Sequence, residues 1–284
     1  MTDHWPAVTC LCPTYGRFER LRDAVACFLL QDYPGEKRLL ICNDAGRGKE
    51  LSVDGFHTRA SGLWIQNLRQ RHGTLGEKRQ GLLHAAGTAV VAHWDDDDLY
   101  LPWHLTQAVE VLMETEGAGC AKPGRAWWVV GPRTGFRVKG HPANVFEGQM
   151  VFLRDRALDL GGYPPIDSGQ AKALLRAFAE AGELHKWNPP PDRLSYCYRW
   201  GGGPAHISAC PEGRRGEHFA RRNRDFGDGQ PLIPGDDPVD WARERLEQPF
   251  RLLARGAAEH LSADAAEVFG ARLGVTPEAG RSRG

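Results

Sequence analysis

The stretch TAVVAHWDDDD, residues 88–98, combines a β-prone apolar run with four consecutive aspartates. The run 88–94 predicts a buried strand, and Asp95, Asp96, Asp97 and Asp98 follow at its carboxyl end. In an open α/β sheet, ligands bind beyond the carboxyl ends of the strands. Four adjacent carboxylates repel one another, and a divalent cation relieves that repulsion, so the stretch predicts a Mg²⁺ or Mn²⁺ site. A solvated acidic turn is the alternative; it is disfavoured because aromatic residues frame the turn: Trp94, Tyr100 and Trp103.

Outward from this stretch, strands and helices are expected to alternate. The expected strands are 7–12, 37–42, 62–68 and 88–94, and the expected helices are 19–32, 76–87 and 102–114. This spacing predicts βαβ units and a mostly parallel sheet flanked by helices, an α/β fold. Beyond residue 120 the pattern loosens, with strands expected at 125–131, 149–154 and 194–200 and helical segments at 168–182 and 238–266.

Composition narrows the class of protein. The 284 residues are 41% hydrophobic and 25% charged, which is typical of a globular chain. The 36 basic and 36 acidic residues balance, so charge does not indicate a general polyanion binder. The seven cysteines form no CxxC pair, there is no signal-peptide pattern, and no apolar run reaches ~18 residues. We expect a cytoplasmic protein with no membrane span.

Three further polar stretches are expected at the same sheet edge as the aspartates. Residues 13–17, PTYGR, follow the first strand, Asn43-Asp44 follows the second, and Lys78-Arg79 lies in the first turn of the helix before the acidic strand. A carboxylate beyond the second strand can accept a hydrogen bond from a nucleobase or a ribose hydroxyl. A Lys-Arg pair can neutralise a diphosphate. Each stretch alone is more common as a turn or a solvated helix face, but together they indicate a nucleotide pocket.

Long blocks of the chain, within residues 7–208, resemble family 2 glycosyltransferases. VTCLCPTYGRFERLRDAVACFLLQDYPGEKRLLICNDA is similar to the opening of that family, and GEKRQGLLHAAGTAVVAHWDDDDLYLPWHL to its next block, which ends in a DXD motif. LDLGGYPPIDSGQAKALLRAFAEAG resembles the approach to the acceptor-side helix. The resemblance implies a GT-A fold and an inverting, metal-dependent hexosyl transfer from a nucleotide-diphosphate sugar, with a UDP-sugar as the default donor.

The resemblance also assigns roles by position. Asp44 would meet the nucleobase, in a pocket lined by Pro13, Thr14, Tyr15 and Arg17, with Lys78 and Arg79 close by. Asp95 and Asp97 match the two aspartates of DXD: Asp97 would ligate Mn²⁺ or Mg²⁺, and Asp95 would touch the ribose or sugar and approach the metal, with Asp96 in the same donor site. His206 matches a histidine that some relatives contribute as a metal ligand, although an ordinary surface histidine is an equal alternative.

One position departs from the family. Where the family has a Glu-Asp pair that supplies the catalytic base, this chain has Gln170-Ala171. Inverting transfer to a hydroxyl needs such a base. Asp167 is the nearest carboxylate; it is either that base or, as we favour, a helix cap together with Ser168, and Glu147 is a further candidate. A catalytically degenerate protein that binds nucleotide-sugar or glycan without transfer is therefore the alternative function. A HAD-like phosphatase ranks lower, since the residue after Asp98 carries no hydroxyl.

The expected domain organisation places a GT-A domain at 1–210, with a nucleotide-binding half at about 1–120 and an acceptor-side half at about 121–210. A basic, Gly-rich loop or lid follows at 211–235, then a helical C-terminal extension with a frayed tail at 236–284. The basic loop would steer a polyanionic acceptor, or it is simply solvated, which we favour. The acceptor class stays open: a glycan, a lipid phosphate, a small molecule or modified nucleic acid. No pattern indicates the oligomeric state.

Overall fold

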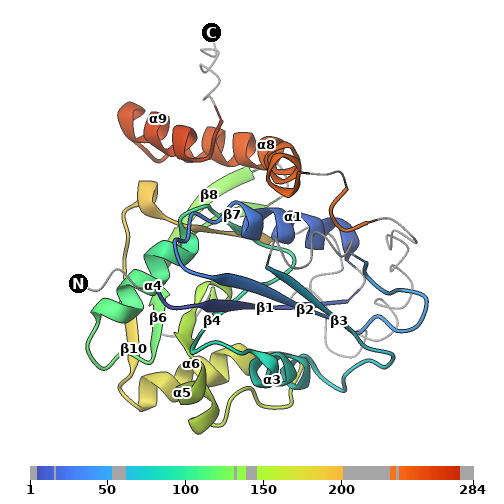
Figure 1. Ribbon diagram of the computed structural model, residues 1–284. Coiled ribbons are helices and arrows are strands. Elements are labelled where there is room, and N and C mark those ends of the chain that lie inside the picture. The colour runs from blue at the N-terminus through green and yellow to red at the C-terminus, as the bar shows by residue number, and fades with distance from the viewer. Residues whose placement is uncertain are drawn as a thin grey trace.

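A seven-stranded sheet runs through the centre of the molecule (Figure 1). The structure is a computed structural model that describes residues 5–15, 17–52, 62–130, 133–138, 146–200, 231–234 and 237–275. In spatial order the strands are β10 (Leu184–Trp187), β6 (Cys120–Pro123), β9 (Val151–Leu153), β4 (Val90–His93), β1 (Val8–Thr14), β2 (Lys37–Asn43) and β3 (Leu63–Asn67). Only the two pairings made by β9 are antiparallel among the ladders described for this sheet. The prediction of a mostly parallel α/β sheet is confirmed.

Helices cover both faces of this sheet (Figure 1). Above it in the view lies α1, with α8 and α9 beyond; below it lie α3, α5 and α6. The helix bounds are α1 Phe18–Leu29, α3 Leu75–Ala85, α4 His104–Glu114, α5 Arg154–Asp159, α6 Gln170–Glu180, α8 Pro238–Ala257 and α9 Ala263–Arg272, with short 3₁₀ turns η1 at Glu147–Gln149 and η2 at Pro191–Arg193.

The strands are apolar on both faces because each face has its own hydrophobic cluster. In β1, Cys10 and Cys12 join the cluster with α1, whereas Leu11 between them joins the cluster with α3 and α6. In β2, Ile41 belongs to the cluster with α1, and Leu40 belongs to the cluster with α3 and α6. Side chains alternate across a strand, so a strand covered on both sides reads as a continuous apolar run.

A second, four-stranded sheet stands beside the acidic turn. Its order is β5 (Leu99–Tyr100), β11 (Tyr196–Trp200), β7 (Arg125–Val130) and β8 (Arg133–Val138). β5 follows the four aspartates directly and pairs with β11. The acidic turn is thus fixed at one end by β4 and at the other by β5, which lie in different sheets.

Most of the expected elements are present, and the omissions have a common cause. The unpredicted elements are short or polar: β5, β6, β8, β10 and α5. In β6, for example, the sequence CAKP includes Lys122, which is fully buried yet reads as a surface residue. Strand pairing in the tertiary structure, and not local hydrophobic pattern, places these segments.

The C-terminal segment packs on α1 and on β8 of the second sheet. The expected helical stretch 238–266 is two helices, because Ser262 caps α9 and accepts a hydrogen bond from the Ala265 N–H. α8 contacts α1 and β8, and the short helical extension predicted from sequence is confirmed. Among the described residues, no helix combines the length and apolar character needed to cross a membrane.

Candidate functional site

The carboxyl ends of β1, β2 and β4 meet at one edge of the central sheet. β1 lies between the other two, with Thr14 opposite Asn43 of β2 and Leu11 opposite His93 of β4. The chain passes from β1 to one side for β2 and later to the other side for β4. Such a reversal of strand order opens a crevice, and crevices of this kind bind ligands in open α/β sheets.

Asp44, directly after β2, is the most enclosed carboxylate in this crevice. It is 1% exposed and accepts a hydrogen bond from the backbone N–H of His72 at 3.1 Å, with the His72 ring nitrogen Nδ1 at 3.3 Å. Lys78 Nζ forms an ion pair with its other oxygen and donates to the Thr14 carbonyl at 2.9 Å. Lys78 therefore joins the ends of β1 and β2, and its positive charge stabilises a carboxylate that burial would otherwise disfavour.

Helix α3 aims Lys78 and Arg79 into the crevice. Thr74 and Glu77 form a capping box at its start, with the Glu77 N–H donating to Thr74 Oγ1 at 3.1 Å and the Thr74 N–H to Glu77 at 3.0 Å. Gly76 allows close packing, since a Cβ there would lie 1.8 Å from the Pro164 carbonyl oxygen. Both features fix where α3 begins, and so fix the basic pair one turn later.

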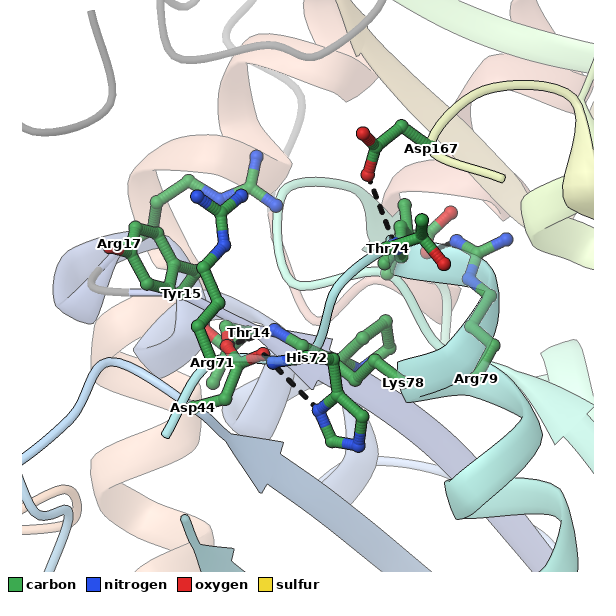
Figure 2. A pocket seen from close by; sticks show the side chains of 13 residues that line it. Thr14, Tyr15, Arg17, Asp44, Arg71, His72, Thr74, Lys78, Arg79 and Asp167 are labelled. Atoms are coloured by element: carbon green, nitrogen blue, oxygen red, sulfur yellow. Dashed lines mark hydrogen bonds and ion pairs between the residues drawn. The ribbon is translucent and has the colours of Figure 1, made fainter. Parts of the chain in front are cut away.

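Two basic residues that sequence reasoning missed complete this end of the crevice. The Arg71 guanidinium lies 4.4 Å from the ring centroid of Tyr15, and His72 contacts Asp44 as described (Figure 2). Both residues follow β3, whose carboxyl end lies at the same sheet edge as those of β1 and β2. The stretch RQRHGT after the third strand was the available signal, because every parallel strand end at this edge is a candidate.

Arg17 binds two neighbouring aspartates of the acidic turn. Its guanidinium forms an ion pair with Asp96, to which Thr14 Oγ1 also donates at 2.6 Å, and its Nη1 donates to Asp97 at 2.6 Å. Burial opposes the charge on Arg17, but Asp96 and Asp97 outweigh it and raise the Arg17 pKa. Burial raises the pKa of Asp96 to about 6, although Arg17 opposes that rise.

The outer aspartates of the turn have different partners. Asp95 pairs with Arg79, and its backbone N–H donates to the Tyr100 hydroxyl at 2.7 Å. Asp98 accepts hydrogen bonds from the Tyr196 hydroxyl and from the Arg199 backbone N–H at 3.0 Å. Burial, together with the charges of its neighbours, raises the Asp98 pKa well above its usual range. Asp96 and Asp98 thus belong to the framework, while Asp95 and Asp97 are 23% and 15% exposed in their side chains.

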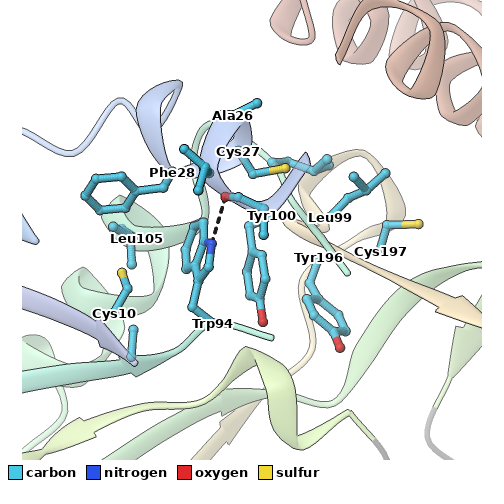
Figure 3. Packing of buried hydrophobic residues seen from close by; sticks show 14 of the residues in the cluster. Cys10, Ala26, Cys27, Phe28, Trp94, Leu99, Tyr100, Leu105, Tyr196 and Cys197 are labelled. Carbon is cyan, nitrogen blue, oxygen red and sulfur yellow. Dashed lines mark hydrogen bonds between the residues drawn. The ribbon is translucent and has the colours of Figure 1, made fainter. Parts of the chain in front are cut away.

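The residues that flank the acidic turn, Trp94 and Tyr100, form an aromatic stack (Figure 3). The Trp94 and Tyr100 rings stack with centroids 3.9 Å apart, and Trp94 Nε1 donates to the Ala24 carbonyl of α1 at 2.9 Å. The Tyr100 hydroxyl bridges to the Gly148 carbonyl at 3.0 Å. Trp103, expected in the same frame, is buried instead against Phe269 of α9.

The crevice is a cleft of about 550 Å³, counting its solvent-open part (Figure 2). Its lining carries basic and acidic side chains on one surface: Pro13, Thr14, Tyr15, Arg17, Asp44, Arg71, His72, Thr74, Leu75, Lys78, Arg79, Asp95 and Asp167. Nine of these are candidates from the sequence. Asp96 lies buried behind the lining and Asp97 beside Arg17, whereas His206 and nearly all of the basic loop lie outside the described residues.

The part of the cleft that is expected to face the acceptor differs from expectation at Asp167. Its Oδ1 accepts a hydrogen bond from the Leu75 N–H of α3 at 3.1 Å, while α6 begins after Gly169 with no side-chain cap. The prediction that Asp167 caps the helix 168–182 with Ser168 is therefore wrong; the positive-φ conformation of Gly169 turns the chain into α6 one residue later. Gln170 and Ala171 are 4% and 6% exposed, so these positions pack inside the protein.

Glu147 lies on η1, outside the cleft lining. A Cβ on the adjacent Gly148 would lie 3.0 Å from Asp95 Oδ2, which places η1 directly behind the acidic turn. Burial raises the Glu147 pKa, although Lys172, Lys122 and Arg79 counteract part of the rise. Glu147 is thus a largely buried carboxylate that does not line the cleft.

Comparison with solved structures places this geometry in a known fold. The chain aligns with Staphylococcus aureus TarS residues 1–349 in complex with UDP-GlcNAc, at a TM-score of 0.57 and 13% identity, covering 94% of this chain and 80% of that one. It aligns with the same protein in complex with UDP at a TM-score of 0.53 and 14% identity, over 94% and 70% of the two chains. The chain has the GT-A glycosyltransferase fold.

More distant and sequence-level comparisons add no further assignment. A mannosyltransferase from Pyrobaculum calidifontis in complex with GDP-Man and Mn²⁺ is 19% identical, covering 95% of this chain and 81% of that one, but its TM-score of 0.49 is too low to bear on this chain's metal. No protein-family model matches the sequence, and no curated protein matches it.

Proposed function

We propose that the protein is a metal-dependent glycosyltransferase that moves a sugar from a nucleotide-diphosphate sugar to a hydroxyl acceptor with inversion. One observation carries the proposal: a single cleft joins buried Asp44 to Asp95 of the acidic turn through Lys78 and Arg79. A nucleoside at the Asp44 end and a sugar at the Asp95 end would place a diphosphate beside the two cations. Charge-assisted contacts of this kind are the strong ones in phosphate recognition.

At the nucleoside end, Asp44 offers a hydrogen-bond acceptor, and Tyr15 with Arg71 over its ring would line the pocket. The backbone around Pro13 and Thr14 would form the wall of this pocket. Because the Asp44 carboxylate already contacts Lys78 and His72, its orientation is fixed before a nucleobase binds to it. The solved TarS complexes contain UDP-GlcNAc and UDP, which favours a UDP-sugar as the first donor to test.

The donor set of the turn fits a hard divalent cation that arrives with a diphosphate. In the part of the chain that the structure describes, no three His, Cys, Asp or Glu side chains gather into a complete metal site. Mg²⁺ and Mn²⁺ bound with nucleotides need only one or two carboxylates besides phosphate oxygens. Asp97 and Asp95 would supply them, with His206 as a further candidate. When bound, the ion would stabilise the negative charge of the departing diphosphate.

For the acceptor proton, we propose Asp167 as the general base. It is the carboxylate on the acceptor side that lines the cleft, and its hydrogen bond from Leu75 fixes one oxygen in place. A base within reach of the acceptor hydroxyl is worth about 10²–10⁴-fold in rate.

A second candidate function is binding of a nucleotide-sugar without transfer. The observation that favours it is the burial of Gln170 and Ala171 where relatives in the resembled family hold an acidic pair. In that case the protein has the residues that bind the nucleotide-sugar but lacks a catalytic base for transfer to an acceptor.

A thermal-shift panel tests the proposal, with UDP, GDP, dTDP, ADP and CDP each measured in Mn²⁺ and in EDTA. A ligand at 100 times its Kd stabilises the native state by about 2.7 kcal/mol, which raises Tm by several degrees. One nucleotide that acts only with metal supports donor binding, and release of UDP from UDP-GlcNAc then separates transfer or hydrolysis from binding alone. No shift with any nucleotide contradicts both candidate functions.

A further inference from the structure

Arg199, at the end of β11, holds the acidic turn from outside. Its backbone N–H donates to Asp98 Oδ1 at 3.0 Å, and its side-chain Nε donates to the Asp97 carbonyl oxygen at 2.6 Å. The side chain is only 12% exposed. One residue thus fixes both the backbone and a carboxylate of the turn, about 100 positions away in the sequence.

The same guanidinium connects the turn to helix α1. Arg199 Nη1 donates to Asp23 Oδ2 at 2.6 Å, and the Asp23 side chain is 11% exposed. The other oxygen of Asp23, Oδ1, accepts from Arg245 Nε of α8 at 2.6 Å. A single carboxylate on α1 therefore separates and orients two arginines from different parts of the chain.

Arg245 is itself anchored on α1. Its Nη2 donates to the Glu19 carbonyl at 2.9 Å, and its Nη1 pairs with the Glu19 carboxylate at 2.8 Å. An unbroken series of hydrogen bonds thus runs from α8 through Asp23 and Arg199 to Asp97. Because guanidinium contacts are planar and directional, the series restricts orientation as well as distance.

Apolar contacts, and not these charges, hold α8 against α1. Leu246, Phe250 and Leu253 are buried on α8 within the same hydrophobic cluster as α1. Partly buried ion pairs contribute little net stability after desolvation, whereas they restrict geometry strongly. The charged series therefore has a role that apolar packing does not supply.

We propose that Arg199, Asp23 and Arg245 are positioning residues through which the C-terminal helix α8 holds the acidic turn in its binding geometry. The proposal rests on the proposed function only in assigning donor binding to that turn. None of the three lines the cleft, so they act through Asp97 and Asp98 rather than on a substrate. The C-terminal helix α8 then contributes to ligand binding by fixing the geometry of the acidic turn.

The test compares Arg245→Ala with Arg251→Ala as the matched control. Arg251 lies on the same helix and pairs with Glu247 at 2.8 Å, but its side chain is 40% exposed. The first readout is hydrogen exchange of the peptide covering 94–100, and the second is the Kd of UDP with Mn²⁺. We expect exchange in this peptide to accelerate at least fivefold and Kd to rise about 5–20-fold in Arg245→Ala only, with partial recovery in Arg245→Lys.

The two readouts separate this proposal from the proposed function. Unchanged exchange at 94–100 in Arg245→Ala, or an equal change in Arg251→Ala, overturns the positioning role whether or not UDP binds. If the wild type binds no nucleotide, the proposed function fails while the exchange result still decides the coupling. A lower Tm with unchanged exchange and unchanged Kd shows that Arg245 only stabilises the docking of α8, which also overturns the proposal.

Discussion

The donor side of the cleft and its acceptor side hold their charges in different ways. On the donor side, Asp44 and Asp95 are each paired with a cation, Lys78 and Arg79, on a helix with a capping box. On the acceptor side, Asp167 accepts one backbone hydrogen bond from α3. Fixed ion pairs keep donor-side groups oriented before a ligand arrives, which reduces the cost of binding. If the proposed function is right, the groups that bind the donor are oriented by the fold itself, while catalysis depends on few groups.

The largest expected effect is on the acceptor side. Asp167→Asn retains an oxygen for the Leu75 N–H but cannot take a proton, so we expect transfer to slow by about 10²–10⁴-fold with the Kd of the nucleotide unchanged. Steady-state transfer assays and calorimetry on the same preparations measure the two quantities. Glu147→Gln is the matched control. If Glu147→Gln slows transfer and Asp167→Asn does not, the base lies behind the turn, and the account of the acceptor side is wrong.

The next effect tests how the donor side is held. In Asp44→Ala, the buried Lys78 loses its partner, and we expect the free energy of unfolding to fall by about 3–5 kcal/mol. The double variant Asp44→Ala/Lys78→Met removes both charges and should recover most of that loss, while neither variant binds nucleotide. Urea unfolding measures the stability. A single variant as stable as the wild type would show that the ion pair does not organise this end of the cleft.

A smaller effect concerns the metal. Asp97→Ala removes a proposed ligand, and we expect UDP affinity in Mn²⁺ to fall about 10–100-fold, as for the loss of one charged contact worth roughly 1.5–3 kcal/mol. In EDTA the affinity should be unchanged or slightly higher, because Arg17 Nη1 loses an anionic partner and becomes available to the diphosphate. Titration calorimetry in both buffers gives the ratio. An undiminished Mn²⁺ effect in Asp97→Ala would remove Asp97 from the metal site.

The smallest effect tests the packing of the aromatic residues that flank the turn. His104 is fully buried beside Trp94, Tyr100 and Tyr196, and burial lowers its pKa to about 3. Below pH ~6.5 His104 is protonated in the unfolded chain but stays neutral in the native state. The free energy of unfolding therefore falls as pH falls. Between pH 7 and 5.5 the free energy of unfolding should drop by about 1.3 kcal/mol more in the wild type than in His104→Gln. Equal pH dependence in urea unfolding would contradict this packing.

Most residues that line the cleft could be predicted from the sequence because their features are local. A strand that ends in a polar pair, as at Asn43-Asp44, is readable from a few residues, and parallel strand ends converge on one edge. Arg71 and His72 were missed because the segment after β3 carries no family motif. The partners of the four aspartates were not readable, since Arg17, Arg79, Tyr196 and Arg199 come from distant segments. The strand that contains the buried Lys122 and the hydrogen bond from Leu75 to Asp167 depend on tertiary contacts, which local propensity does not encode.

The proposed function requires that one cleft bind a nucleoside diphosphate together with a metal ion. The most direct measurement is calorimetric titration of UDP into the intact protein in Mn²⁺ and in EDTA, alongside Asp44→Ala/Lys78→Met. We expect 1:1 binding that is at least tenfold tighter with Mn²⁺ and is absent in the double variant. Binding that survives in the double variant, or no binding of UDP or of the other nucleoside diphosphates under either condition, would contradict it.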